Sequence, residues 1–344
     1  MKSAAFLALA AAAGLAAAQP EDWGDFDAEW ANNPEYESSK GLCRGLRDRE
    51  PPVSDRPTPA QAAELRGCSS EDLYYGIGMP ADPERARLCA FVEADEAPGH
   101  AFSGRAMLMT IYANGRGARR DLDVAIHLAC GIDGAPAESH GRVTHLAELR
   151  DRGWSGSNFH YCDDITSGLS GGSCAGHAAA VAGARREAEL ARISAGWAAD
   201  ARRSFAALRE TFDAYAEAHA SGETNLSGTL RVALQVGAEE RLRDQFLEMI
   251  RLLEAGDAPA FSAQQMRMAD AVLNSAYRQA LRANRGGGAE AVGPDGIRDA
   301  QRAWLRYRDA FLAFAAIRYP NARRHSLAAW LTRQRNELLR DLRD

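Results

Sequence analysis

The sequence predicts an all-α protein, with a short helical-hairpin repeat domain followed by a helical-bundle domain. No stretch after residue 18 alternates β-branched and polar residues over the length of a strand. In the second half, apolar residues recur three and four positions apart, as Phe205, Leu208 and Phe212 do, which is typical of one helix face. In the first half, two Gly-x-Gly turns lie 39 residues apart between helix-like segments. The composition, 46% hydrophobic and 26% charged, excludes wholesale disorder and a fibrous repeat.

Residues 1–18 have the pattern of a secretory signal. Lys2 is followed by an apolar run that ends in the small residues Ala16 and Ala18, so we expect cleavage after Ala18. The alternative, an uncleaved membrane anchor, is disfavoured because a spanning helix needs roughly 20 apolar residues, and no later stretch approaches that length either. We therefore expect a periplasmic or secreted protein without a transmembrane anchor.

Residues 19–60 are acidic at first and then rich in proline. Such a composition buries little apolar surface, so we expect an extended, partly flexible lead-in. Trp23 and Trp30 are the side chains by which this lead-in can dock on a folded domain.

Residues 61–150 contain an internal repeat, in which each unit reads as helix, Gly-x-Gly turn and helix. The glycines provide the tight turn, an aspartate is placed to cap the second helix, and an alanine lets the two helices approach closely. The matching residues of the two units are Gly76, Gly78, Asp82 and Ala86, and then Gly115, Gly117, Asp121 and Ala125. Ala137 to Leu149 reads as a fragment of a third unit.

This pattern resembles the Sel-one-like repeat family, relatives of the tetratricopeptide repeats, over about residues 64–150. The resemblance implies stacked two-helix units that form a short solenoid. The second unit has Tyr112 at the position of the family's tyrosine, whereas the first unit has Leu73 there. The alternative is a generic helical bundle whose spacing is coincidental.

Residues 151–175 interrupt the repeat with Gly, Ser and Asp, and we expect a disulfide-closed loop. The chain has an even number of cysteines, all before residue 175, which in an exported protein indicates three disulfides. They are Cys43, Cys68, Cys89, Cys130, Cys162 and Cys174. Six cysteines allow about 15 pairings. Our preference is Cys162 with Cys174 and Cys68 with Cys89, which leaves Cys43 and Cys130.

Residues 176–344 predict five helices. Apolar spacing indicates the first between His177 and Ala220 and the second around Leu242 to Leu253. The third begins at Ser262, whose Gln265 completes a capping box. The fourth follows Pro294, and the fifth carries Leu327, Leu331 and Leu338.

Within this half, the segments from Met268 to Tyr277 and from Asp299 to Ala310 resemble the lysozyme-inhibitor LprI-like family, as does the run Leu331 to Arg335. The resemblance covers about residues 190–342 and implies binding to a protein partner and inhibition of lysozyme. Many relatives carry a cysteine where Phe311 stands here. The candidate partner-binding residues of the family motif are Gln301, Arg302, Trp304, Tyr307, Arg308 and Asp309.

The alternative interpretation of this motif is structural. A large aromatic residue on the inward face of a helix usually belongs to the core, which applies to Trp304. Arg302 with Asp299, and Arg308 with Asp309, then serve as local ion pairs.

The charge of the chain is unevenly distributed. Residues 271–344 hold 14 arginines against seven acidic side chains, while the rest of the chain is acidic. A basic end is repelled by the strongly basic animal-type lysozymes, so any inhibition needs the acidic half or a local carboxylate. Nucleic acid is not expected as a partner, because no basic stretch is interleaved with aromatic residues.

The sequence offers no convincing catalytic or metal site. Gly168 to Gly172 matches the Gly-x-Ser-x-Gly pattern around Ser170, but no apolar strand precedes it. His160, Cys162, Cys174 and His177 have spacings that zinc accepts, yet thiols of exported proteins usually form disulfides. We therefore expect a protein that is not an enzyme and has no cofactor and no bound metal.

Two hypotheses of function follow. In the first, the chain is an exported envelope protein that inhibits lysozyme or a related cell-wall hydrolase. In the second, it is a non-catalytic helical-repeat scaffold for periplasmic protein–protein interactions.

Overall fold

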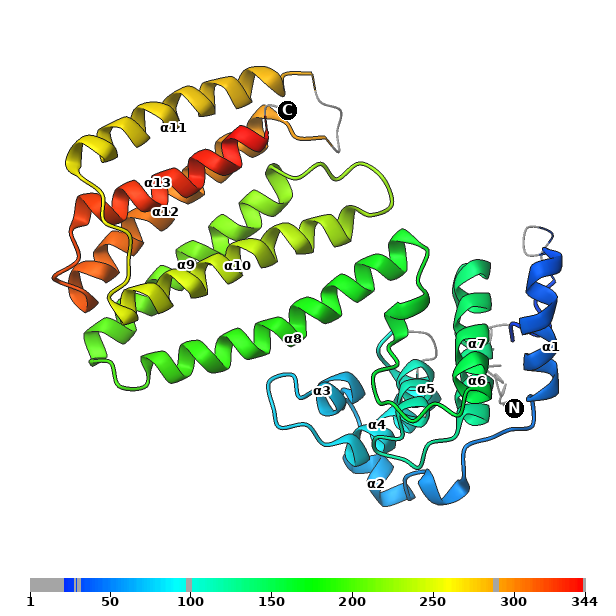
Figure 1. The fold of residues 1–344 in the computed structure, drawn as a ribbon. Coiled ribbons are helices and arrows are strands. Elements are labelled where there is room, and N and C mark those ends of the chain that lie inside the picture. The colour runs from blue at the N-terminus through cyan, green and yellow to red at the C-terminus, as the bar shows by residue number, and fades with distance from the viewer. Residues whose placement is uncertain (1–21, 28, 30–31, 97–100, 287–290, 343–344) are drawn as a thin grey trace, which may run out of the picture.

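The computed structural model describes residues 22–27, 29, 32–96, 101–286 and 291–342. These residues form thirteen α-helices and a few short 3-10 turns, and the described part of the chain contains no β-strand (Figure 1). The predicted all-α class is therefore confirmed. The predicted signal and Trp30 lie outside the described residues.

Seven helices make up the N-terminal half, where most of them are short. They are α1 (Glu37–Gly45), α2 (Pro59–Glu64), α3 (Ser70–Tyr75), α4 (Pro83–Glu96), α5 (Gly104–Asn114), α6 (Leu122–Cys130) and α7 (Pro136–Asp151). Consecutive helices from α3 to α7 pack against one another. Among them α5 is the most deeply placed, because nearly all of its residues are buried.

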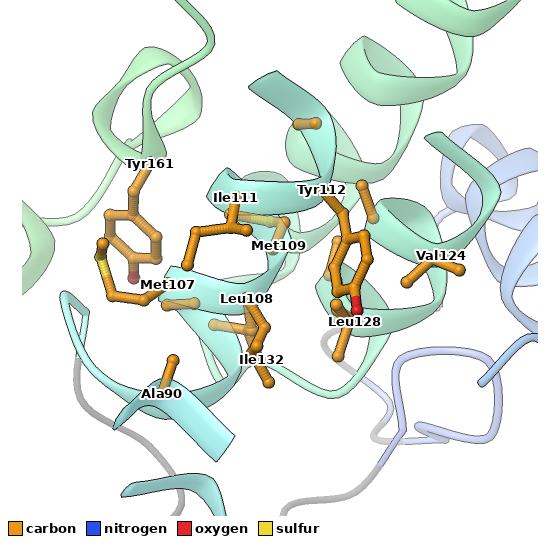
Figure 2. Close-up of a cluster of buried hydrophobic side chains, with 14 of the residues drawn as sticks. Ala90, Met107, Leu108, Met109, Ile111, Tyr112, Val124, Leu128, Ile132 and Tyr161 are labelled. Carbon is orange, nitrogen blue, oxygen red and sulfur yellow. The ribbon is translucent and has the colours of Figure 1, made fainter. Parts of the chain in front are cut away.

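The N-terminal core is built around α5. Figure 2 shows Tyr112 of this helix on the side of Val124 and Leu128 of α6, and Met107 on the opposite side, next to Tyr161. All five side chains are less than a tenth exposed. A helix that is apolar on every side, as α5 is, needs neighbours all round, and the flanking hairpin helices supply them.

The described part of the lead-in does not match the expectation of an extended, flexible segment. The Trp23 ring is buried in the N-terminal core, and its Nε1 donates a hydrogen bond to Ser39 Oγ at 2.8 Å. Lys40 lies 5.1 Å from the centre of the same ring. A disulfide joins Cys43 of α1 to Cys130 of α6. This expectation was wrong because one buried tryptophan and one covalent link offset the polarity of the segment.

Six helices make up the C-terminal half. They are α8 (Gly168–Ser194), α9 (Ala199–Gly222), α10 (Arg231–Ala255), α11 (Ala263–Ala283), α12 (Pro294–Arg318) and α13 (Arg324–Asp341). Helix α9 packs on α12, α11 on α13 and α8 on α10 (Figure 1). Their apolar side chains form a second hydrophobic cluster, from Leu190 to Leu339, that shares no member with the first.

The number of helices in this half corrects the prediction of five. Helix α8 begins at Gly168, inside the segment expected to be a loop, because Ser167 caps it by accepting a hydrogen bond from the Ser170 backbone N–H at 3.2 Å. The predicted first helix is then interrupted between Ser194 and Ala199. The predicted starts at Ser262, with its capping box, and at Pro294 are confirmed.

Helix α8 connects the two clusters. Near its first turns, His177 Nδ1 lies 2.6 Å from Glu71 Oε1 of α3. Further along, Arg186 Nη2 lies 2.6 Å from Glu240 Oε2 of α10, and Leu190 belongs to the second cluster. Across the described residues, we find no helix with the length and apolar character that a bilayer span requires.

Candidate functional site

The motif residues on α12 do not share one surface. Gln301, Trp304 and Tyr307 are buried, and Trp304 is among the largest fully buried side chains. The Tyr307 ring stacks on Tyr215 of α9, with ring centres 5.6 Å apart. These three side chains therefore pack α12 against its neighbours.

Of the other three motif residues, Arg302 and Asp309 are exposed and Arg308 is partly exposed, and all three pair locally. Arg302 donates a hydrogen bond to the Asp299 carboxylate one helical turn earlier. Arg308 Nη2 lies 2.9 Å from Asp309 Oδ1, and its guanidinium lies 5.3 Å from the centre of the Trp304 ring. Exposed pairs of this kind contribute little to stability. The structural interpretation thus explains the positions of all six motif residues. A protein partner could reach only Arg302, Arg308 and Asp309.

A buried ionic network lies beside the motif. Arg335 of α13 donates two hydrogen bonds of 2.6 Å to the Glu223 carboxylate, and its Nε donates to Gln301 Oε1 at 2.9 Å. His219 Nδ1 lies 2.8 Å from the same carboxylate. Burial is the largest influence and raises the pKa of Glu223, but the charge and hydrogen bonds of Arg335, together with the His219 contact, outweigh it and hold this pKa below its ordinary value. The network joins the end of α9 to α12 and α13.

From the sequence, Arg335 was predicted only as part of the run Leu331 to Arg335, and neither His219 nor Glu223 was predicted as a functional residue. One signal was present. Arg335 lies midway between Leu331 and Leu339, four residues from each, so it shares their inward helix face. A charged residue at such a position needs a buried partner.

The C-terminal half carries a cleft of about 710 Å³ at one end of its helices. We call it the end cleft. It lies between the connection from α10 to α11 (residues 256–262) and the connection from α12 to α13 (residues 319–323), with parts of the adjoining helices. Its main apolar lining residues are Leu253, Pro259, Phe261, Tyr319, Pro320 and Leu327. Two arginines, Arg318 and Arg323, also line it.

The shape of the end cleft is fixed by hydrogen bonds between its two sides. The buried Ser326 hydroxyl accepts a bond from the Phe261 backbone N–H at 2.8 Å and donates one to the Pro259 carbonyl at 2.8 Å. The Tyr319 hydroxyl donates to Glu254 at 2.7 Å. Burial, followed by the Glu254 contact, raises the pKa of this phenol, so it remains a donor at neutral pH. Such a preformed site loses little entropy when a ligand binds.

The repeat residues occupy equivalent places in two helical hairpins, α3–α4 and α5–α6. Gly76 and Gly115 end the first helix of each hairpin in the left-handed region, with φ of 74° and 64°. Asp82 and Asp121 cap the second helices by accepting hydrogen bonds from backbone N–H groups at 3.1 and 3.0 Å. Ala86 and Ala125 are fully buried.

The next glycines of the two turns differ in their surroundings. A Cβ at Gly117 would lie 2.2 Å from the Pro83 carbonyl oxygen, so the second turn sits on the start of α4 in the first hairpin. No atom lies within 4 Å of a Cβ at Gly78. The first turn instead borders a groove of about 790 Å³ that Ala180, Ala184 and other α8 residues line on the opposite side.

The six cysteines form the three preferred disulfides, Cys43–Cys130, Cys68–Cys89 and Cys162–Cys174. All three lie in or next to the N-terminal half. The bond between Cys162 and Cys174 occupies the two thiols that a zinc site would have used. Three disulfides are typical of a protein that folds outside the cytoplasm.

Ser170 lies in the first turn of α8, not at a turn between a strand and a helix. Its hydroxyl donates a hydrogen bond to Glu138 Oε2 at 2.8 Å, and the Thr166 and Ser167 backbone N–H groups donate to Oε1 of the same carboxylate. Burial opposes ionisation of Glu138, but these donors hold its pKa below the ordinary value. Ser170 thus serves to position a buried carboxylate.

Residues 255–339 match the model of a protein family described as lysozyme inhibitor LprI. No curated protein and no solved structure shows significant similarity to the chain. The matched segment contains the six motif residues of α12, Arg335 and both connections that enclose the end cleft. The coarse resemblance of the C-terminal half is therefore supported, while the Sel-one-like resemblance of residues 64–150 stays a prediction.

Proposed function

We propose that the chain is a non-catalytic, extracytoplasmic protein that binds and inhibits lysozyme or a related cell-wall hydrolase. The observation that carries this proposal is the match of residues 255–339 to the lysozyme inhibitor family, because that segment builds most of the end cleft. The disulfides support a location outside the cytoplasm, in the periplasm or secreted after removal of residues 1–18.

The proposal divides the chain by task. The LprI-like domain, residues 176–344, carries the partner-binding surface. Residues 61–150 form a Sel-one-like repeat domain. The Cys43–Cys130 disulfide joins residues 19–60 to it, while Cys162–Cys174 closes a loop within residues 151–175. The acidic charge outside residues 271–344 steers a basic hydrolase toward the molecule, while the basic end makes short-range contacts only.

The direct test is a lysis assay on peptidoglycan with purified chain 19–344. Animal-type, invertebrate-type and bacterial hydrolases are assayed with increasing inhibitor over a range of salt concentrations. We expect stoichiometric inhibition of at least one class, weakened by salt because screening reduces steering between opposite charges. An acidic protein of similar size is the control. Full lysis by all classes at micromolar chain would refute the proposal.

The alternative function is a scaffold, and one observation favours it. The turn at Gly78 lacks the cover that the equivalent turn at Gly117 has, and it borders the groove beside α8. In this version a helix of another envelope protein fills the groove. Pull-down from envelope extract with the full chain tests it, and Ala184→Trp is the matched variant. Capture that survives Ala184→Trp excludes the groove as the binding site.

A further inference from the structure

The end cleft combines an apolar interior with a positively charged edge. Among the residues that line it, the charged ones are Arg318 and Arg323, and none carries a carboxylate. Asp257, in the connection from α10 to α11, does not line the cleft. A ligand that fills this cleft therefore meets apolar carbon inside and guanidinium groups at the edge.

The two arginines differ in what they already bind. Arg318 is engaged, because its Nη2 lies 3.0 Å from the Glu254 carboxylate and its guanidinium lies over the rings of Trp197 and Tyr319. Arg323 is exposed, and it forms no ion pair with any residue that the structure describes. Its charge is thus available to a ligand.

The local setting of Arg323 is unfavourable for a cation. It is the N-cap of α13, Arg324 is the first helical residue, and the first turn contains neither an acidic side chain nor a side-chain cap. The N-terminus of a helix carries partial positive charge, so two arginines there raise the local potential. Proteins break such local rules of helix capping and charge mainly at functional sites.

We infer that the end cleft binds a stretch of a partner polypeptide that presents a carboxylate beside apolar side chains, with Arg323 as the residue that recognises the carboxylate. Charge complementarity and the apolar lining select this occupant. The inference rests on the proposed function and deepens it.

A binding experiment with short probes tests the inference on the full chain 19–344. The probe is a fluorescein-labelled, end-blocked pentapeptide in which leucine alternates with glutamate, and the matched peptide has glutamine in place of glutamate. Fluorescence anisotropy follows the binding. We expect saturable binding of the glutamate peptide and roughly tenfold weaker binding of the glutamine peptide, because a charge-assisted contact to arginine is lost. Salt should weaken only the former.

Two variants locate the contact. Arg323→Gln should weaken binding of the glutamate peptide about tenfold and leave the glutamine peptide unchanged. Arg282→Gln is the control, because Arg282 is an exposed arginine near the other end of α11 and makes no ion pair among the described residues. Thermal melts confirm that both variants fold, as expected for exposed side chains. Equal loss in both variants, or equal binding of the two peptides, overturns the inference.

Other occupants give distinct outcomes. Decanoate that displaces the glutamate peptide, and itself binds more tightly, identifies a site for small amphiphiles and overturns the inference. A concentration-dependent dimer that Arg323→Gln abolishes identifies a second copy of the chain as the occupant, with the same consequence. Peptide binding without inhibition of any hydrolase upholds this inference and refutes the proposed function. If the chain inhibits a hydrolase and Arg323→Gln leaves that inhibition unchanged, the proposed function is upheld and this inference is overturned.

Discussion

At the scale of single residues, two fully buried arginines have opposite surroundings. Arg335 is bound by Glu223 and Gln301, whereas the three guanidinium nitrogens of Arg142 have no hydrogen-bond partner among the described residues. The Arg142 guanidinium lies 4.8 Å from the centre of the Tyr161 ring, and burial lowers its pKa. The Arg335 guanidinium is hydrogen-bonded within a network, whereas the Arg142 guanidinium has the charges of Glu138 and Asp164 nearby but no hydrogen bond among the described residues.

This difference predicts opposite effects of the same substitution. Arg335→Met leaves the Glu223 carboxylate buried without its cation, and such a loss costs about 3–5 kcal/mol of unfolding free energy. Arg142→Met removes a desolvated charge and keeps the volume, so stability should be unchanged or higher. Urea unfolding of both variants checks this. A loss of equal size in Arg142→Met would show that Arg142 has partners of comparable strength.

His160 predicts a dependence of stability on pH. Burial lowers the pKa of this histidine below its ordinary value near 6.5, and the neighbouring His177, with ring centres 5.0 Å apart, lowers it further, although Asp163 acts in the opposite direction. Between the two pKa values, His160 is therefore protonated in the unfolded chain and neutral in the folded chain. The stabilisation is present above about pH 6.5 and is lost as the pH falls through the interval below it.

Melting temperatures from pH 7.5 to about 5 check this expectation. They should fall with the pH, and the His160→Gln variant should show a smaller fall, because it lacks the titrating imidazole. Glutamine can still accept the 3.2 Å hydrogen bond from the Cys162 backbone N–H, so the local structure is kept. His325→Gln is the control on α13. The carboxylates with lowered pKa, Glu138 and Glu223, titrate below about 4.5 and do not interfere. An unchanged slope in His160→Gln would assign the effect to other groups.

The residues that sequence reasoning placed correctly are those whose spacing alone determines their burial. Tyr307, which is buried, was predicted only as a candidate partner-binding residue, but Trp304 lies seven positions before Phe311 on one helix face, so its inward direction could be predicted. The pairing of Arg335 with Glu223 could not, since the two residues are 112 positions apart and only the packing of α9 on α12 and α13 brings them together.

At the scale of elements, the structure explains which helix boundaries were predictable. Helices α11 and α12 begin at local signals, a capping box and a proline, which act through neighbouring backbone groups. Helix α8 begins in a stretch rich in glycine and serine, which have low helix propensity. Its start depends on the Cys162–Cys174 disulfide and on Glu138, which no local pattern reveals.

The two repeat turns allow a matched test of hairpin stacking. Gly78 and Gly117 both have positive φ, 72° and 93°, so alanine at either position costs roughly 1–2 kcal/mol in backbone strain. Only at Gly117 does the new Cβ also overlap the Pro83 carbonyl. The unfolding free energy of Gly117→Ala should therefore be lower than that of Gly78→Ala by about 1–3 kcal/mol, which is the usual cost of overpacking.

Urea unfolding of the two variants measures this difference, as the free energy of unfolding of the N-terminal half. Equal losses in the two variants would mean that the contact between the hairpins relaxes easily. A larger loss in Gly78→Ala would contradict the assignment of an open first turn.

At the scale of the whole molecule, the two halves differ in what holds them together. The disulfides lie in the N-terminal part and at the start of α8, while the described helices from α9 onward contain no cysteine. Stability of the second cluster therefore comes from packing and from the Arg335 network. This difference could be predicted from the positions of the cysteines, but the burial of the lead-in that Cys43–Cys130 secures could not.

Reduction should separate the two halves in a thermal scan. With a reductant, the transition of the N-terminal cluster should move to lower temperature, since losing a single native disulfide costs a small domain about 2–5 kcal/mol. The transition of the C-terminal cluster should stay in place. Scanning calorimetry with and without dithiothreitol measures both. A single transition that shifts as a whole would indicate that the clusters unfold as one cooperative unit.

Helix α8 runs for 27 residues without a break, a length of about 40 Å. Its first turns are fixed to the N-terminal cluster and its later turns to the C-terminal one. A flexible tether allows many separations between two binding surfaces, whereas this helix sets one. Partners held by both halves would gain avidity only when their own sites match that separation, because effective concentration falls steeply once the geometry is wrong. The molecule can therefore select its partners by distance as well as by chemistry.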